Sequence, residues 1–229
     1  MPLRRTLEIS AWAGGLLLLA IYFGIRAWSA QASEEGVEAM RQARAAHAAM
    51  LAANPDAGIP PTASAAPKSL SAAQPDTSTW NQKRIEEYHE ALKHSATPQA
   101  VLRIPKLKLE VPVYTGTSDF VLNRGAGHIE GTAAVDSTTG NIGVAAHRDG
   151  FFRMLKDIEV GDVMYLDTIA DTREYRVSRL DIVTPKDVHV LDPTPTSTVT
   201  LVTCYPFYFV GTAPERFIVR AQIAQPAGS

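Results

Sequence analysis

From Val101 to Ala221 the chain is a succession of short segments rich in β-branched and aromatic residues, separated by Gly, Pro or Asp. Segments of this length and composition favour β-strands. The segments that we expect to be strands are 101–113, 141–147, 162–169, 172–183, 198–203 and 216–221. Between them, residues 151–158 and the stretch around 186–190 look helical. Many short strands with few helices predict a mainly β fold, either a closed or nearly closed barrel or a sandwich.

The N-terminal segment has a different pattern. Residues 9–25 are seventeen uncharged and mostly apolar residues, the lower end of the length that spans a membrane as a helix. The run is longer than a signal-peptide core, although residues 30–32 resemble a small-residue cleavage site. Arg4 and Arg5 precede it and acidic residues follow it, so the positive-inside rule places residues 1–8 in the cytoplasm. We expect an uncleaved, single-pass anchor over 9–28 in the cytoplasmic membrane, with the rest of the chain outside the cytoplasm.

A linker is expected over residues 29–77. Its first part, 33–54, is Ala-rich and plausible as a helix with little to pack against. Its second part, 55–77, carries five prolines among Ala, Ser and Thr, with too few large apolar groups to offset the entropy of ordering. The composition therefore predicts a flexible, partly extended spacer between the anchor and a domain.

Residues 78–97 predict a helix that packs on the domain. Ser78 or Thr79 is a candidate N-cap, and apolar residues recur at helical spacing on one face: Trp80, Ile85, Tyr88 and Leu92. The barrel itself is expected over 98–223, followed by a short tail over 224–229.

Charge and cysteine content limit the function. A net charge of −2 provides no general attraction to nucleic acid, so we set that class aside. Export would place the chain in an oxidising compartment, where cysteines are usually paired in disulfides. The chain has a single cysteine, Cys204, so that thiol is either inert and buried or reactive.

Cys204 follows the alternating run 198–203 and precedes Tyr205 and Pro206. Proline cannot continue a central strand because it lacks the N–H of the ladder. The thiol is therefore expected at the C-terminal end of a strand, a position that suits a nucleophile. The alternative is that Cys204 is a small buried hydrophobic residue.

A cysteine nucleophile needs a base or cation nearby, because an ordinary thiol with a pKa of about 8.5 is scarcely ionised at neutral pH. His147 ends segment 141–147 before a turn, the same placement as Cys204, and is the best partner. His128 lies among glycines, where a histidine that holds a loop is as plausible as a partner of the thiol. His189 is expected at the surface.

Arg216, which begins segment 216–221, is a candidate third group because a guanidinium donates several hydrogen bonds to a carbonyl or oxyanion. Antiparallel pairing of 198–203 with 216–221 would not by itself bring Arg216 to Cys204, whereas a parallel or neighbouring arrangement could, and the sequence leaves this undecided. An ordinary strand-edge arginine paired with an acid is the alternative.

Residues 200–204, TLVTC, with Arg216 downstream and NIGVAAHRDGFF over 141–152 upstream, resemble the signature of the sortases, membrane-anchored cysteine transpeptidases of the bacterial surface. The similarity runs from about 103 to 221, and CYPFYFVGTAPERFIVRA from Cys204 onward is most similar to class D and the related Gram-negative sortases. The resemblance implies an eight-stranded barrel with Cys204, His147 and Arg216 meeting at one end.

The resemblance also implies a reaction. Cys204 attacks the Thr–Gly bond of an LPXTG-like signal on a secreted protein and forms a thioester, while His147 protonates the leaving amine and then acts as base for an incoming amine, such as that of a cell-wall precursor. Arg216 holds the carbonyl or its oxyanion, and His128 and Thr203 are expected to contact substrate. No metal and no cofactor are expected, because no acidic calcium cluster is evident in the sequence.

Two other functions stay open at the level of the sequence. One is an exported thiol hydrolase that releases its peptide to water; the other is a non-catalytic anchored β-barrel adaptor with a buried Cys204. The order of His147 before Cys204 differs from that of papain-like enzymes.

Overall fold

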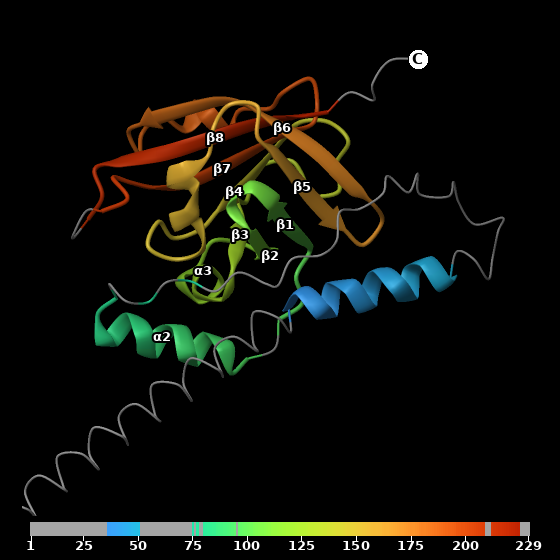
Figure 1. The fold of residues 1–229 in the computed structure, drawn as a ribbon, viewed down its shortest axis with the longest axis horizontal. Helices are drawn as coiled ribbons and strands as arrows, with labels where there is room; N and C mark the ends of the chain where they lie inside the picture. The colour runs from blue at the N-terminus through green and yellow to red at the C-terminus, as the bar shows by residue number, and fades with distance from the viewer. Residues whose placement is uncertain are drawn as a thin grey trace, which may run out of the picture.

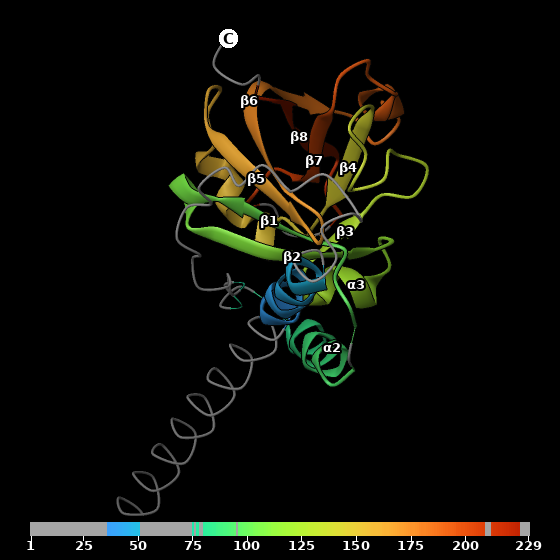
Figure 2. The ribbon, with the colours of Figure 1, turned by 90° about the vertical axis from the view of Figure 1, so that its right-hand side faces the viewer.

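The computed structural model describes residues 36–50, 75, 77, 80–94, 96–208 and 212–224. Its centre is a closed barrel of eight strands in the spatial order β1-β2-β3-β4-β7-β8-β6-β5 (Figures 1 and 2). The strands are β1 (Ala100–Ile104), β2 (Leu109–Thr115), β3 (Ala126–His128), β4 (Asn141–Ala145), β5 (Val163–Thr168), β6 (Thr172–Val183), β7 (Thr198–Tyr205) and β8 (Glu215–Ile223). The prediction of a mainly β fold is confirmed, and the fold is a closed barrel rather than a sandwich.

Two features of the barrel differ from the strand pattern. Segment 101–113 is two antiparallel strands, β1 and β2, joined by the 3-10 turn η2 (Pro105–Leu107) and by Lys108 in the left-handed region at φ 51°. β3 was not predicted, because three residues are too few to show alternation. β3 needs Gly127, since a Cβ there would collide with the backbone oxygen of Gly116.

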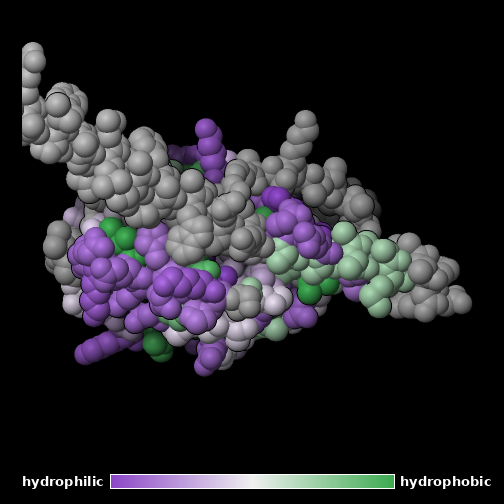
Figure 3. Space-filling model, turned by 90° about the horizontal axis from the view of Figure 1, so that it is seen from below, coloured by the Kyte–Doolittle hydropathy of each residue, from purple (hydrophilic) through white to green (hydrophobic). Residues whose placement is uncertain are grey.

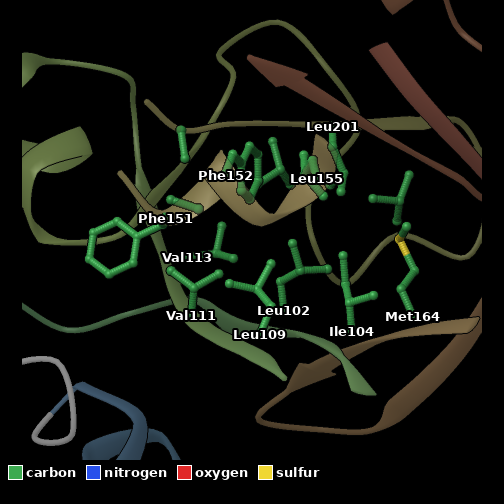
Figure 4. Packing of buried hydrophobic residues seen from close by; sticks show 14 of the residues in the cluster. Leu102, Ile104, Leu109, Val111, Val113, Phe151, Phe152, Leu155, Met164 and Leu201 are labelled. Atoms are coloured by element: carbon green, nitrogen blue, oxygen red, sulfur yellow. The ribbon is translucent and has the colours of Figure 1, made fainter. Parts of the chain in front are cut away.

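The barrel interior is filled by alternate residues of the strands, as the period of two requires. A 3-10 helix, η3 (Phe151–Asp157), adds Phe152 and Leu155 to this interior, both fully buried. Figure 4 shows these two side chains above Leu102 and Val113, with Leu201 of β7 beside them. Residues 151–158 and 186–190 were expected to be helical, and both contain 3-10 helices, the second being η4 (Val188–Leu191).

Helix α2 (Gln82–Leu92) precedes the barrel and packs on it. Its N-cap is Asn81, whose side chain accepts a hydrogen bond from the Arg84 N–H at 2.9 Å; the predicted caps Ser78 and Thr79 lie outside the described residues. Trp80, Tyr88 and Leu92 belong to the same buried cluster as the barrel interior. The opposite face of α2 is hydrophilic (Figure 3), with exposed residues Gln82, Lys83, Glu86, Glu87, Glu90 and Lys93.

Residues 36–50 form a helix that lies on the same side of the barrel as α2 (Figures 1 and 2). The expectation that this part of the linker has little to pack against is wrong, because Val37 and Met40 are buried against Val101 of β1. Among the described residues, no helix is long and apolar enough to cross a membrane. The anchor predicted over 9–28 lies outside the described residues.

Ion pairs between partly exposed arginines and buried carboxylates attach the helix over residues 36–50 to the barrel. Arg103 of β1 donates two hydrogen bonds to Asp167 of β5, and both side chains are at most one-tenth exposed. Arg44 adds a second cation 3.3 Å from Asp167, and Arg41 lies 2.9 Å from Glu110 of β2. Burial raises the pKa of Asp167, but the hydrogen bonds from Arg103 and Thr172 outweigh it and keep that pKa below its ordinary value. Asp167 is therefore a carboxylate that pairs both with Arg103 and with Arg44 of the helix over residues 36–50.

Substitution Asp167→Asn should lower the free energy of unfolding by about 3–5 kcal/mol, because it leaves the buried guanidinium of Arg103 without its counter-charge. Urea unfolding measures this loss. The matched control is Glu159→Gln, which breaks the ion pair between Lys106 and a side chain that is 76% exposed and should cost about 0–1 kcal/mol. Equal losses in the two variants would contradict the structural role of the buried pair.

Candidate active site

Three neighbouring strands, β4, β7 and β8, bring together the residues that the sequence singled out. In the antiparallel β7–β8 ladder Cys204 lies directly opposite Arg216, so their side chains are on the same face of the sheet. In the parallel β4–β7 ladder Ala145 lies opposite Val202, an offset of 57 (202 − 145). His147 and Cys204 have the same offset (204 − 147), so His147 follows β4 at the level of Cys204.

The register continues past the last pair of the β4–β7 ladder. The N–H of Ala146 donates to the carbonyl of Val202 at 3.3 Å, and the hydroxyl of Thr203 donates to the carbonyl of Ala146 at 2.8 Å. His147, Cys204 and Arg216 therefore form one row across three adjacent strands. We call these three residues the catalytic row, after the roles that the sequence analysis predicts for them.

The position of Arg216 corrects the sequence argument. Antiparallel pairing does bring Arg216 to Cys204, because the β7–β8 ladder extends to the pair Tyr205 and Glu215. The sequence pattern ended one strand at Thr203 and began the other at Arg216, which left the Cys204 level outside the expected ladder. The Arg216 guanidinium is held at the start of β8, where Nη1 donates to the carbonyls of Glu215 at 2.9 Å and Ala213 at 3.3 Å.

The catalytic row lies on the outer face of the barrel. Leu201 and Val219 point into the interior cluster. Cys204 is three residues from Leu201 and Arg216 is three residues from Val219, and an odd separation along a strand reverses the face, so both side chains point outward. Cys204 is a free cysteine of intermediate exposure. This placement does not fit the alternative in which Cys204 is an inert, buried side chain.

The connection between β6 and β7 covers the outer face next to the row. Its 3-10 helix η4 is held there by the carbonyl of Val190, which accepts hydrogen bonds from Arg220 of β8 at 2.7 Å and Asn141 of β4 at 3.0 Å. Ile218 of β8 is also on the outer face and is only 1% exposed. The row is thus flanked on this side by a connection packed against the sheet.

Helix α2 and the residue Trp80 just before it cover the His147 end of the row. The indole Nε1 of Trp80 donates to the carbonyl of Asp149 at 2.7 Å, and Arg84 lies over the Trp80 ring and 3.7 Å from the Asp149 carboxylate. These contacts fall two residues after His147, so α2 encloses the histidine rather than the cysteine. The sequence analysis missed Trp80 and Arg84 as neighbours of the site, because nothing local in residues 78–97 points to His147.

The environment of His147 disfavours its charged form. Burial, above all, lowers the pKa of His147 from 6.5 to about 4, and the Arg84 cation adds to the lowering, while the carboxylates of Asp149 and Asp119 oppose it. The Nε2 atom of His147 is buried and has no hydrogen-bond partner within the described structure. At neutral pH this imidazole is therefore neutral when α2 is in place.

The other predicted site residues lie elsewhere. Thr203 is 2% exposed and its hydroxyl is bonded to Ala146, so the structure gives it a backbone contact; contact with substrate stays an untested prediction. The His128 ring bonds within its own loop, to the carbonyl of Ala133 at 2.9 Å and the hydroxyl of Thr132 at 3.2 Å. His189 is exposed, as expected. In the part of the chain that the structure describes, no group of three or more His, Cys, Asp or Glu side chains could hold a metal ion.

Known proteins resemble this chain in sequence and in fold. The family model described as the sortase domain matches residues 102–224. Sortase D of Bacillus subtilis (strain 168) is 33% identical over 120 residues, 52% of this chain and 60% of that protein, so the match spans less than two thirds of this relative. A Clostridium perfringens Sortase D5 transpeptidase superposes with a TM-score of 0.51 and 26% identity, covering 61% of this chain and 88% of that one. Sortase E1 of Streptomyces coelicolor with a tripeptide in the active site superposes with a TM-score of 0.50 and 31% identity, covering 56% and 88%.

The pKa of His147 predicts a loss of stability in acid. The pKa of His147 is about 4 in the folded protein, whereas the unfolded chain has the ordinary value of 6.5. As the pH falls, the unfolded chain therefore takes up the proton first. Above pH 6.5 this pKa difference leaves the free energy of unfolding unchanged. As the pH falls to about 4, it lowers the free energy of unfolding by about 2–3 kcal/mol. Urea unfolding at pH 7 and pH 4 should therefore show a smaller acid loss in His147→Gln than in the wild type. The same loss in both proteins would rule out this placement of the imidazole.

Proposed function

The chain belongs to the sortase family, and we propose that it is a cysteine transpeptidase that cleaves an LPXTG-like sorting signal and transfers the acyl group to an amine at the cell surface. The observation that carries the proposal is the catalytic row, in which a partly exposed thiol has an imidazole just after the end of one neighbouring strand and a guanidinium on the other neighbouring strand. These are the nucleophile, the proton carrier and the oxyanion donor that acyl transfer through a thioester requires.

In the proposed first half-reaction the Cys204 thiolate attacks the carbonyl carbon of the threonine in the signal. A C–S bond forms, the C–N bond to glycine breaks, and the His147 imidazolium gives its proton to the leaving amine. In the second half-reaction the neutral imidazole takes a proton from the incoming amine, whose nitrogen attacks the thioester. The C–S bond breaks, an amide forms, and the thiolate and imidazolium are restored.

The burial of His147 bears on how this chemistry begins. A pKa of about 4 means that few molecules carry the imidazolium at neutral pH in the arrangement with α2 in place. The reactive thiolate–imidazolium pair is then a minor population. Substrate binding or movement of α2 would raise that population by giving the imidazolium a partner or solvent.

Arg216 suits the role of oxyanion donor. Its Nη1 atom is fixed by two backbone carbonyls, so the guanidinium is oriented before substrate arrives. A guanidinium carries five donors on a rigid plane, and Nη1 alone supplies these two bonds. Preorganised donors of this kind stabilise the charge that develops on a carbonyl oxygen.

The setting of the reaction also belongs to the proposal. The anchor expected over 9–28 would hold the enzyme in the cytoplasmic membrane with the barrel outside, next to secreted proteins that carry the signal and to an amine such as that of a cell-wall precursor. The tripeptide in the active site of Streptomyces coelicolor Sortase E1 supports a peptide substrate for this fold.

Variants Cys204→Ala and His147→Ala should both abolish thioester formation with an LPXTG peptide, because one removes the nucleophile and the other the proton carrier. Mass spectrometry of the acyl-enzyme and chromatography of products with and without an added amine measure this. The matched control is His189→Ala, which removes an exposed imidazole and should leave the activity unchanged. Full activity in Cys204→Ala would refute the proposal, and products that added amines never change would indicate a hydrolase.

Variant Arg216→Lys should lower the acylation rate by roughly 10- to 100-fold, because a lysine keeps the charge but cannot reproduce the planar fork of donors. Stopped-flow measurement of the first turnover separates this step from transfer. Arg179→Lys on β6, whose side chain is 68% exposed, makes the same change away from the row and should have no effect. A normal acylation rate in Arg216→Lys would exclude the oxyanion role.

A further inference from the structure

Arg148 connects the chain after His147 to the chain after Cys204. Its Nη1 atom donates a hydrogen bond to the carbonyl of Pro206 at 3.1 Å. Arg148 follows His147 directly, and Pro206 comes two residues after Cys204. One side chain therefore spans the gap between the two strand ends on which the proposed chemistry depends.

This contact lies where the sheet no longer supplies one. The last pair of the β4–β7 ladder is Ala145 with Val202, and the chain then turns, with the carbonyl of His147 accepting bonds from the N–H groups of Gly150 at 3.1 Å and Phe152 at 3.2 Å. On the other side β7 ends at Tyr205. Pro206 has no N–H, so its carbonyl is the single backbone group through which it can be held by a hydrogen bond.

A second contact brackets the row from the opposite side. The Thr203 hydroxyl is bonded to the carbonyl of Ala146, so the residue before Cys204 is tied to the residue before His147. Arg148 makes the matching tie after the two residues. With one tie on each side, sliding of one strand end along the other would break at least one hydrogen bond.

The hydrogen bond of Arg148 is distinct from the charges that shift the pKa of His147. The charged side chains that act on the pKa of His147 are Arg84, Asp149 and Asp119. Arg148 is next to His147 in sequence and donates a hydrogen bond to the backbone of the other strand end, at Pro206. The hydrogen bond rather than the electrostatic field is thus the feature to test.

We infer that Arg148 is a positioning residue: by binding the Pro206 carbonyl, it holds His147 at the level of Cys204. The inference rests on the proposed function as a transpeptidase. Proton transfer needs heavy atoms within hydrogen-bond reach, and a displacement of about 1 Å can cost 100-fold in rate. Loss of this tie should therefore act on the chemical step and much less on the binding of the peptide.

The test measures kcat and KM for an LPXTG peptide with an added amine. R148M, which removes every donor, should lower kcat by roughly 10- to 100-fold and change KM by less than about 3-fold. R148K, which keeps an N–H donor on its ammonium group, should recover part of the lost kcat. The matched control is R176M, because Arg176 also donates to a loop carbonyl, that of Gly161 at 3.0 Å, but on the β5–β6 side of the barrel. Circular dichroism and thermal unfolding check that each variant is folded.

A normal kcat in folded R148M would overturn the inference, and so would a raised KM with normal kcat, since that pattern indicates substrate binding. If R148M does not fold, R148K decides in the same way. Equal losses in R148M and R176M would also count against it, because they would mark a general effect on the fold.

A readout without sorting peptide separates this inference from the proposed function. The rate of Cys204 alkylation by iodoacetamide is measured in the wild type, H147A, R148M and the double variant. If Arg148 acts by keeping His147 beside Cys204, H147A should change the rate in the wild-type background and change it by less than about 2-fold in the R148M background. Independent, multiplicative effects of the two substitutions would refute the positioning role even if transpeptidation is confirmed. Absence of transpeptidation together with the expected coupling would refute only the proposed reaction.

Discussion

The site depends above all on the register of three strands. The parallel ladder between β4 and β7 and the antiparallel ladder between β7 and β8 bring to one level residues that are 57 and 12 positions apart in sequence. A slip by one residue in either ladder would turn a side chain to the opposite face. The interior packing of Leu201 and Val219 resists such a slip, because it would expose apolar side chains and bury polar ones. The core of the barrel and the geometry of the site are therefore fixed by the same alternation.

The cover that α2 places on His147 combines stabilising and destabilising contacts. Trp80 and Tyr88 bury apolar surface with the barrel core, which stabilises the docked helix. Several polar atoms at the same contact are buried without a hydrogen-bond partner among the described residues, namely Nε of Arg84, the Tyr88 hydroxyl and Nε2 of His147. Each such group costs about 1–3 kcal/mol. The enclosure thus combines apolar contacts with unmet polar groups next to His147, the residue that we propose to exchange a proton.

The helix over residues 36–50 is attached by a different kind of contact. Its apolar contribution is small, Val37 and Met40 against Val101, and its arginines reach carboxylates that the barrel already holds in its sheet. Asp167 is needed by Arg103 whether or not the helix is docked, so the acceptor is preformed. The chain between the proposed anchor and the catalytic row is therefore partly fixed to the barrel rather than a free tether.

The sequence alone predicted the mainly β fold class and singled out Cys204 and His147 as the candidate nucleophile and base, because alternation and the end of a strand before proline are local properties. Its signature residues also indicated the family. It did not reveal β3, the pairing of Arg216 with Cys204, the cover over His147 or the Arg148 contact with Pro206. Each of these joins segments far apart in the chain, and such pairings follow from how the whole barrel closes and packs. Local patterns decide which residues can form strands, whereas only the closed structure decides which strand ends meet.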